Sequence, residues 1–321
     1  MNRTDNGKII YIVGIAGIFL VVGLLTFLYM KNRNDNTNTT NADREKVSAE
    51  EGTTEDMWLK NLEENNTLEL SRMSHENRQT VTGTDYEAFD NKLCAWWFKR
   101  NDNHEKSGCQ EDFDIVQYDA YYTVPVSEKR MFITFDCGYE NGFTADILDV
   151  LKRENVTAAF FVTQTFIRDN IDLVKRMKEE GHLVCNHTVT HPSMPSKSVS
   201  EQKEEILKCE NYMKEATGYD MDLFFRPPKG EYSERTLRLA KNLGYTTIFW
   251  SMAYLDYDVN NQPSAEHVVE HFSKYHHPGA IPLIHNVSKA NHDAIGRVIE
   301  LLKKEGYSFG SLYELKTNPC Q

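Results

Sequence analysis

The chain lacks an excess of positive charge. Its 36 lysines and arginines are outnumbered by 48 aspartates and glutamates, which gives a net charge of −12. Such a chain has little with which to displace the counterions of DNA or RNA, so we expect no nucleic-acid partner. Cysteine is also scarce, with six in 321 residues, which excludes a small fold held together by disulfides. The remaining composition, 40% hydrophobic and 11% aromatic, is that of a globular protein with a large core.

Long apolar runs are absent from the sequence except for one near the N-terminus. Residues 9–30 contain no charged side chain and are bracketed by Lys8 and Lys31. As a helix this run would reach roughly 33 Å, enough to cross a hydrocarbon core of about 30 Å. A cleaved signal peptide is the alternative, but its apolar core is normally about 7–15 residues long. We therefore expect one uncleaved transmembrane helix.

The composition on either side of this run divides the chain into segments. Residues 1–8 are expected to be a short cytoplasmic tail, because the basic residues flanking the run are nearly balanced and the free amino terminus favours the inside. Residues 31–56 are rich in Asn, Thr, Asp and Glu, so they cannot bury enough apolar surface to fold and are expected to be a flexible linker. Residues 57–130 are expected to be an N-terminal extension that packs on a catalytic domain, residues 131–317.

From Met131 onward short apolar runs alternate with amphipathic stretches. The expected strands are 131–136, 158–163, 183–187, 223–227, 246–252, 280–285 and 308–312. The expected helices are 144–154, 167–180, 200–217, 233–243, 264–275 and 291–305. This alternation predicts an α/β fold, a distorted (β/α) barrel of about seven parallel strands. Four of the helices are followed by a glycine suited to a left-handed C-cap, namely Gly181, Gly218, Gly244 and Gly306.

Ionisable side chains stand at the ends of several expected strands. Asp136, His187, Arg226 and His285 end the first, third, fourth and sixth strands, and Asp256 lies just beyond the fifth. Each residue alone could be a helix cap or a hydrogen-bonded core residue. Because the ends of parallel strands meet on one rim, where such folds gather catalytic groups, their joint placement indicates an active site.

The sharpest local pattern is Asn186-His187-Thr188-Val189-Thr190-His191-Pro192. Two histidines four residues apart can bind one divalent ion, either along a helix or across a tight turn. Pro192 disfavours the α conformation at His191, so we expect the turn. Two histidines on a solvated loop are the alternative.

Five ordered segments, MFITFDCGYENG, GHLVCNHTVTHP, FFRPPKG, FWSMAYLDY and IPLIH, resemble the motifs of the polysaccharide deacetylases (NodB-type, carbohydrate esterase family 4). The FDCGYENG segment, together with WFKR at 97–100 and YDAYY at 118–122, is similar to one branch of that family. This branch is the sporulation N-acetylmuramic acid deacetylases, which make the muramic δ-lactam of the spore cortex.

The resemblance implies a metal-dependent hydrolytic mechanism. His187 and His191 would hold a divalent cation, expected to be zinc, and Asp136 would be the general base for the water held by that cation. Arg226 would orient the carboxylate of Asp136. His285 would be the general acid for the leaving amine.

Further roles follow from the same resemblance. Asp256 would support the imidazolium form of His285. The backbone N–H of Lys229 would contact the tetrahedral oxyanion. Lys229, Tyr139 and Pro228 are expected to bind the substrate.

Two motifs depart from the family pattern. The usual metal-binding aspartate after the base is Cys137, which would be either a thiolate ligand or a small buried hydrophobe. In the fifth-strand motif, Ala253 replaces the first aspartate and Tyr257 replaces a tryptophan.

Cys94 and Cys109 flank a polar loop and would be either a disulfide or free thiols.

The branch implies peptidoglycan glycan strands as the partner, with muramic acid whose stem peptide an amidase has removed. Because the wall lies outside the cell, the catalytic domain is expected to be extracytoplasmic. Three alternatives remain at this point: a non-catalytic glycan-binding membrane protein, a deacetylase of N-acetylglucosamine in peptidoglycan, and an amidase that uses the Cys137 thiol as its nucleophile.

Overall fold

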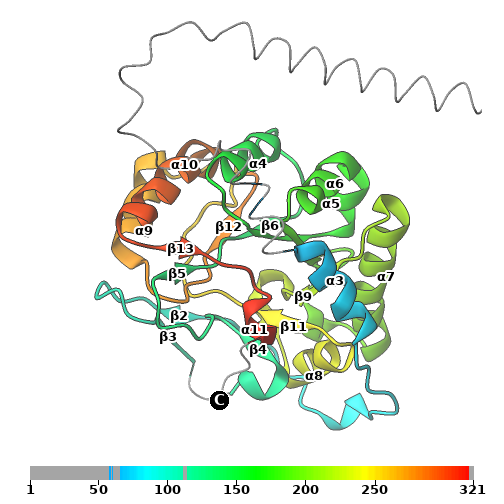
Figure 1. Ribbon diagram of the computed structural model, residues 1–321. Coiled ribbons are helices and arrows are strands. Elements are labelled where there is room, and N and C mark those ends of the chain that lie inside the picture. Colours follow the sequence, from blue (N-terminus) through cyan, green and yellow to red (C-terminus); the bar gives the residue numbers. More distant parts are fainter. Residues whose placement is uncertain (1–57, 59, 61–65, 111–113, 318–321) are drawn as a thin grey trace, which may run out of the picture. The chain divides into compact units, whose positions relative to one another are not determined.

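The central feature of the protein is a parallel sheet of seven strands (Figure 1). The computed structural model describes residues 58, 60, 66–110 and 114–317. The strands lie in the order β12–β6–β7–β8–β9–β11–β4. Their bounds are β4 Ala120–Tyr121, β6 Thr134–Cys137, β7 Ala159–Val162, β8 Leu183–Asn186, β9 Asp222–Phe225, β11 Thr246–Ile248 and β12 Leu283–His285. The expected α/β fold with seven parallel strands is confirmed.

The sheet curls, so that chain segments near its opposite sides meet. Beyond β11, Met252 forms a parallel bridge with Pro282, which precedes β12. The backbone N–H of Ser251 donates to Ile281 O, and that of Leu283 donates to Met252 O, each at 2.9 Å. These bonds bring the carboxyl ends of the strands around one pocket.

The seventh strand of the sheet is not the predicted one. Residues 308–312 were expected to supply it, but β13 (Ser308–Phe309) pairs with β5 (Arg130–Met131) in a separate two-stranded sheet. The place at the sheet edge belongs to β4, which pairs with β11 through Thr247 and Ala120. The barrel therefore includes a strand from the segment expected to be an extension.

Helices surround the curled sheet (Figure 1). Their bounds are α4 Thr144–Arg153, α5 Gln164–Asp169, α6 Ile171–Glu179, α7 Val199–Thr217, α8 Glu234–Asn242, α9 Ala265–Tyr275 and α10 Lys289–Lys304. The expected single helix 167–180 is wrong, because the chain breaks at Asn170, whose side chain donates to Phe166 O at 3.0 Å. The predicted C-cap glycines are confirmed: Gly181, Gly218, Gly244 and Gly306 have φ of 77°, 83°, 84° and 83°.

Side chains alternate along the strands between two apolar layers. On β6 and β7, Phe135 and Phe160 belong to the layer between sheet and helices, together with residues of α4, α6 and α10. Phe161 belongs to a second layer with Phe132 and Leu183 inside the curled sheet. This alternation decides which strand residues can reach the pocket.

The segment before β4 also packs on the barrel. It comprises α3 (Thr67–Glu76), β1 (Cys94–Ala95), β2 (Phe98–Lys99) and β3 (Gly108–Cys109). β1 pairs antiparallel with β10 (Glu231–Tyr232), and β2 pairs antiparallel with β3. In this structure Cys94 and Cys109 are free thiols, both half-buried.

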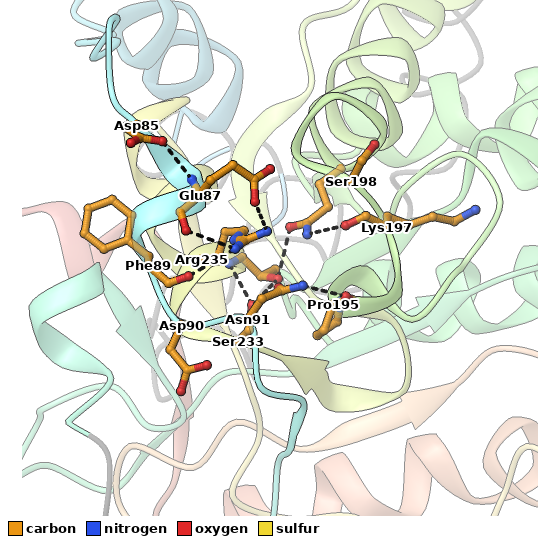
Figure 2. A network of polar contacts seen from close by, with 12 residues as sticks. Asp85, Glu87, Phe89, Asp90, Asn91, Pro195, Lys197, Ser198, Ser233 and Arg235 are labelled. Atoms are coloured by element: carbon orange, nitrogen blue, oxygen red, sulfur yellow. Dashed lines mark hydrogen bonds and ion pairs between the residues drawn. The ribbon is translucent and has the colours of Figure 1, made fainter.

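A polar network fastens residues 85–91 to the barrel (Figure 2). Arg235 forms a 2.7 Å ion pair with Glu87. Asn91 donates to Pro195 O at 2.8 Å and accepts from Ser233 Oγ at 2.9 Å. Pro195 lies in a 3₁₀ turn, η3 (Met194–Ser196), and Ser233 caps α8. The network thus joins two elements that follow different strands.

Among the described residues, no helix is long and apolar enough to cross a membrane. The predicted transmembrane helix 9–30 and linker 31–56 lie outside the described residues.

Candidate active site

Asp136 and His285 face each other across two adjacent strands. β6 and β12 pair in parallel with His285 opposite Asp136, so both side chains leave the sheet on the same face. Both line a pocket of about 780 Å³ at the carboxyl ends of the strands. The sequence placed these residues on one rim, and the structure brings them together.

Asp136 is held by a buried arginine. Arg226, which directly follows β9, is 0% exposed and donates from Nη1 to Asp136 Oδ1 at 2.7 Å. Its guanidinium also donates to Thr134 Oγ1 and Ile248 O, both at 3.0 Å, and lies 4.1 Å over the ring of Phe161. Burial alone would raise the pKa of Asp136, but the charge and hydrogen bond of Arg226, together with the nearby His187 and His285, lower it by more. The net pKa is lowered, and the carboxylate is ionised at neutral pH.

His285 is oriented by Asp256, which is 1% exposed. The imidazole Nδ1 lies 2.7 Å from Asp256 Oδ1, and the backbone N–H of His285 donates to Oδ2 at 2.8 Å. Asn291 donates to the same Oδ2 at 2.7 Å and thereby fixes the carboxylate. Burial lowers the pKa of His285, but the charge and hydrogen bond of Asp256, together with the charge of Asp136, raise it by more, so the net pKa is raised. This pair can hold a proton on His285 for transfer.

The two histidines of the NHTVTHP pattern lie on a turn, as predicted. Thr188 and His191 have positive φ of 73° and 57°, which excludes an α-helix there. Thr188 Oγ1 accepts from His191 N at 3.0 Å, which closes the turn. Glu205 of α7 accepts from Val189 N and Thr190 N at 2.9 and 2.8 Å. A β-branched residue in the left-handed region is rare and typical of functional sites.

The tautomer of His187 follows from its contacts. Its Nδ1 lies 2.8 Å from Arg226 O, and because a carbonyl only accepts, Nδ1 carries the proton. Nε2 therefore presents its lone pair, 3.5 Å from Asp136 Oδ2. The ring of His191 is 4.8 Å away, centroid to centroid.

The residues at this turn fit a divalent cation. Burial lowers the pKa of His187, and burial together with His187 lowers the pKa of His191 to about 4. Both imidazoles are thus neutral at physiological pH, the form that binds metals. In the part of the chain that the structure describes, no cluster of three or more His, Cys, Asp or Glu side chains is arranged to hold a metal ion. His187 and His191 would therefore be the imidazole ligands available to such a cation at this turn.

Cys137 lies on the opposite face of β6 from Asp136. Its side chain is 0% exposed and packs in the apolar layer with Phe135, Ile147 and Leu148. Burial raises the pKa of the thiol well above its usual value, so no thiolate is present. The suggestion that Cys137 ligates the metal is therefore corrected: consecutive strand residues point to opposite faces, and Cys137 belongs to the core.

The expected substrate-binding residues are only partly at the pocket. Lys229 and Tyr139 line it. Pro228 is buried in the turn that presents Lys229 and is not among the lining residues. Arg226 and Asp256 also lie behind the pocket wall, where each contacts a residue that lines it.

Sequence reasoning missed several lining residues, namely Trp250, Leu283, Asn286, Thr163 and Thr165. Trp250 and Asn286 each stand within two residues of a strand end. Their position just beyond a strand was the available signal. Thr163 and Thr165 lie at the start of α5, and no pattern in the sequence distinguished them from ordinary helix caps.

Comparisons with known proteins agree with this geometry. The polysaccharide deacetylase family matches residues 123–248. The peptidoglycan-N-acetylmuramic acid deacetylase PdaA of Bacillus subtilis is 42% identical over 231 residues, covering 71% of this chain and 88% of that protein. A peptidoglycan-N-acetylglucosamine deacetylase of Bacillus cereus is 31% identical over 210 residues, covering 64% of this chain and 75% of that protein.

A solved structure shows the same architecture. The structure of Bacillus subtilis PdaA, described as a family 4 carbohydrate esterase, matches with a TM-score of 0.70 and 40% identity, covering 72% of this chain and all of that one. The strand-end residues, the pocket and these relatives lead to one conclusion. The chain belongs to the polysaccharide deacetylase family, carbohydrate esterase family 4.

Proposed function

We propose that this protein is a hydrolase that removes the N-acetyl group from N-acetylmuramic acid in peptidoglycan. The observation that carries the proposal is the pairing of an ionised Asp136 and a proton-holding His285 in one pocket with two neutral histidines. The choice of N-acetylmuramic acid as the substrate is supported by the 42% identity to the peptidoglycan-N-acetylmuramic acid deacetylase of Bacillus subtilis.

Asp136 acts as the general base. Its Oδ1 is occupied by Arg226, while Oδ2 faces His187 Nε2 at 3.5 Å. The free oxygen is positioned to take a proton from water attacking the acetyl carbonyl carbon. Because Arg226 keeps the carboxylate ionised, the base is ready at neutral pH.

His285 acts as the general acid. Asp256 binds its Nδ1, so Nε2 is left to donate a proton to the sugar nitrogen as the C–N bond breaks. The products are acetate and a free amine. Asp256 favours the protonated form of His285 and is a positioning residue rather than a group that touches the substrate.

His187 and His191 would hold a divalent cation, with zinc as the proposed ion. When bound, it would polarise the acetyl carbonyl and lower the pKa of water in the site. We propose that the backbone N–H of Lys229, which has a positive φ of 61°, contacts the carbonyl oxygen as charge develops there.

The side chain of Lys229 suits the lactyl carboxylate that distinguishes muramic acid from glucosamine. An ammonium group at the pocket wall can pair with such a carboxylate. The amine freed beside that carboxyl group can condense with it, with loss of water, to the muramic δ-lactam of spore cortex. Closure requires an unsubstituted carboxylate, so we propose that an amidase removes the stem peptide first.

We further propose that the protein acts at the outer face of the cell membrane during sporulation. Peptidoglycan lies outside that membrane, and residues 9–30 form an uncharged run long enough to span it. The N-terminus would be cytoplasmic and the catalytic domain extracytoplasmic.

The test is a product analysis with glycan strands free of stem peptides. The wild-type protein and the Asp136→Asn variant are each incubated with these strands and zinc, and the fragments are examined by mass spectrometry. Deacetylated muramic acid or its lactam, formed only by the wild type, is expected. Deacetylation of glucosamine alone would assign the alternative activity shown in the name of the Bacillus cereus relative, and no acetate release would refute the hydrolase.

A further inference from the structure

An exposed strip runs along residues 93–99, outside the active-site pocket. Its alternate residues, Leu93, Ala95, Trp97 and Lys99, are exposed, while Trp96 between them is buried. Trp97 is 53% and Leu93 is 49% exposed. Because side chains of an extended chain alternate between two faces, these four residues share the outward face. A large aromatic ring in solvent is uncommon and often marks a binding surface.

The strip is joined directly to the wall of the pocket. β1 pairs with β10 through Ala95 and Glu231, and Trp96 N donates to Gly230 O at 2.8 Å. The indole Nε1 of Trp96 donates to Trp250 O at 2.9 Å. Gly230 and Trp250 both line the pocket. Trp96 is therefore bonded to two residues of the pocket wall, and Trp97 is the next residue in the chain.

Close packing holds this junction in place. Gly230 has a φ of +67°, and a Cβ there would lie 2.7 Å from the Trp250 ring and 3.2 Å from Trp96 Cβ. A larger residue at this position would push the strip away from the wall. Gly230 thus fixes the position of the strip relative to the pocket wall.

The hairpin beyond Trp97 is anchored to the chain that follows β11. Arg100 donates to Ala253 O at 2.9 Å, and Ser107 Oγ donates to Ser251 O at 2.9 Å. Tyr122 OH donates to Ser107 O at 3.1 Å. A binding surface held by such bonds loses little conformational entropy when it is occupied.

The chemistry of the strip suits an acidic carbohydrate. The indole of Trp97 offers a flat apolar face to the C–H groups of a pyranose ring. Lys99, two residues further on the same face, offers an ammonium group to a carboxylate. Seven extended residues span about 20 Å, a length that several successive sugars of a strand can contact.

We infer that the outward face of residues 93–99 is a second glycan subsite, where Trp97 stacks on a sugar and Lys99 pairs with a lactyl carboxylate of the same strand that occupies the pocket. This inference rests on the proposed function, because it takes the ligand to be a peptidoglycan glycan strand. The subsite would act on binding and leave the chemistry at Asp136 and His285 unchanged.

The test measures binding separately from catalysis. In the inactive Asp136→Asn background, the affinity for stem-free glycan strands is measured with and without Trp97→Ala. We expect Trp97→Ala to weaken binding about 3- to 10-fold and Trp97→Phe to restore most of it. Met73→Ala, a matched loss of a 44% exposed apolar side chain on α3, should change nothing. Equal affinity of the Trp97→Ala and parent proteins overturns the subsite.

Two further measurements sharpen the assignment. Lys99→Ala should weaken binding to glycan strands but not to chitin chains, which lack the carboxylate, whereas Trp97→Ala should weaken both. In the active enzyme, Trp97→Ala should raise KM on long strands with kcat unchanged and leave both constants unchanged on a single disaccharide. A KM effect equal on both substrates would contradict a subsite beyond the pocket.

These results are separable from a failure of the proposed function. If the wild type releases no acetate, the hydrolase proposal fails, while the binding comparison still supports or overturns the surface. If the wild type is active and the Trp97 and Lys99 variants match it in both assays, only the subsite fails.

Discussion

The carboxylate of Asp256 contacts His285 twice, at the imidazole Nδ1 at 2.7 Å and at the backbone N–H at 2.8 Å. The first contact favours a proton on the ring, and the second fixes the Asp256 carboxylate to the end of β12. Because Asp256 is 1% exposed, solvent screens neither contact effectively. Asp256 therefore contributes most to the proton affinity of His285, and Asp136 adds to it.

Asp256→Asn should move the alkaline limb of activity to lower pH. His285 must be protonated to donate, so activity falls as pH rises through its pKa, which Asp256 raises. Without the negative charge that pKa falls, and fewer molecules hold the proton at neutral pH. We expect kcat/KM to drop about 10²-fold or more, measured as a pH profile of acetate release. An alkaline limb that does not move would contradict the assigned acid.

Arg226→Met should leave Asp136 buried beside no positive partner. The pKa of Asp136 would then rise, since burial raises it and Arg226 is the strongest of the groups that lower it. The acid limb of kcat/KM should therefore shift to higher pH. Breaking a buried pair costs about 3–5 kcal/mol, measurable by urea unfolding.

Adding Asp136→Asn to Arg226→Met removes the unpaired charge and serves as the control. The double variant should be more stable than Arg226→Met alone, although inactive. If the double variant has the same free energy of unfolding as Arg226→Met, then Arg226 does not stabilise the fold through its ion pair with Asp136.

Cys137→Ala should retain zinc affinity and activity. The thiol lies in the apolar layer behind β6, so its loss should cost about 1 kcal/mol of stability without touching the pocket. Zinc titration by calorimetry and the acetate assay measure the two effects. A tenfold weaker zinc affinity would restore Cys137 as a ligand, and complete loss of activity with zinc bound would favour the thiol amidase.

Removal of metal should abolish activity, and added zinc should restore it. His191→Ala should prevent this recovery, because it removes one of the two imidazoles at the turn, and should weaken zinc binding by at least tenfold. His292→Ala, which replaces a histidine bonded to Asp146 on α4, is the matched control. Full activity of chelated protein would exclude the metal from the mechanism.

Asn91→Ala should destabilise the whole domain, because Asn91 joins η3 to the start of α8 (Figure 2). Losing both bonds should cost about 1–3 kcal/mol, measured by thermal or urea unfolding. Asn103→Ala, at an exposed position of the hairpin between β2 and β3, should cost far less. Equal stability of both variants would show that residues 85–91 are not fastened as described.

Much of the site could be predicted because parallel strands end on one edge. Asp136, His187, Arg226 and His285 each stand at or directly after a strand in the structure, and a sequence with alternating strands and helices carries that information. The turn between His187 and His191 could also be predicted, since Pro192 disfavours the α conformation of the residue before it.

Other features depended on contacts between distant residues. β4 and β13 have two residues each, too few for a hydrophobic period, so pairing alone decided which of them entered the main sheet. The break at Asn170, whose side chain donates to Phe166 O, falls inside residues 167–180, which were expected to form one continuous helix.

By itself, the sequence determined the alternation of strands and helices from β6 to β12, the glycines that end the helices and the residue types on the catalytic rim, because these depend on neighbours in the chain. Only the tertiary structure decided that Asp136 turns into the pocket while Cys137 turns into the core, and that Trp96 packs inward and leaves Trp97 exposed. The physical reason is that adjacent residues of an extended chain point to opposite faces, and which face is buried depends on the elements that pack there.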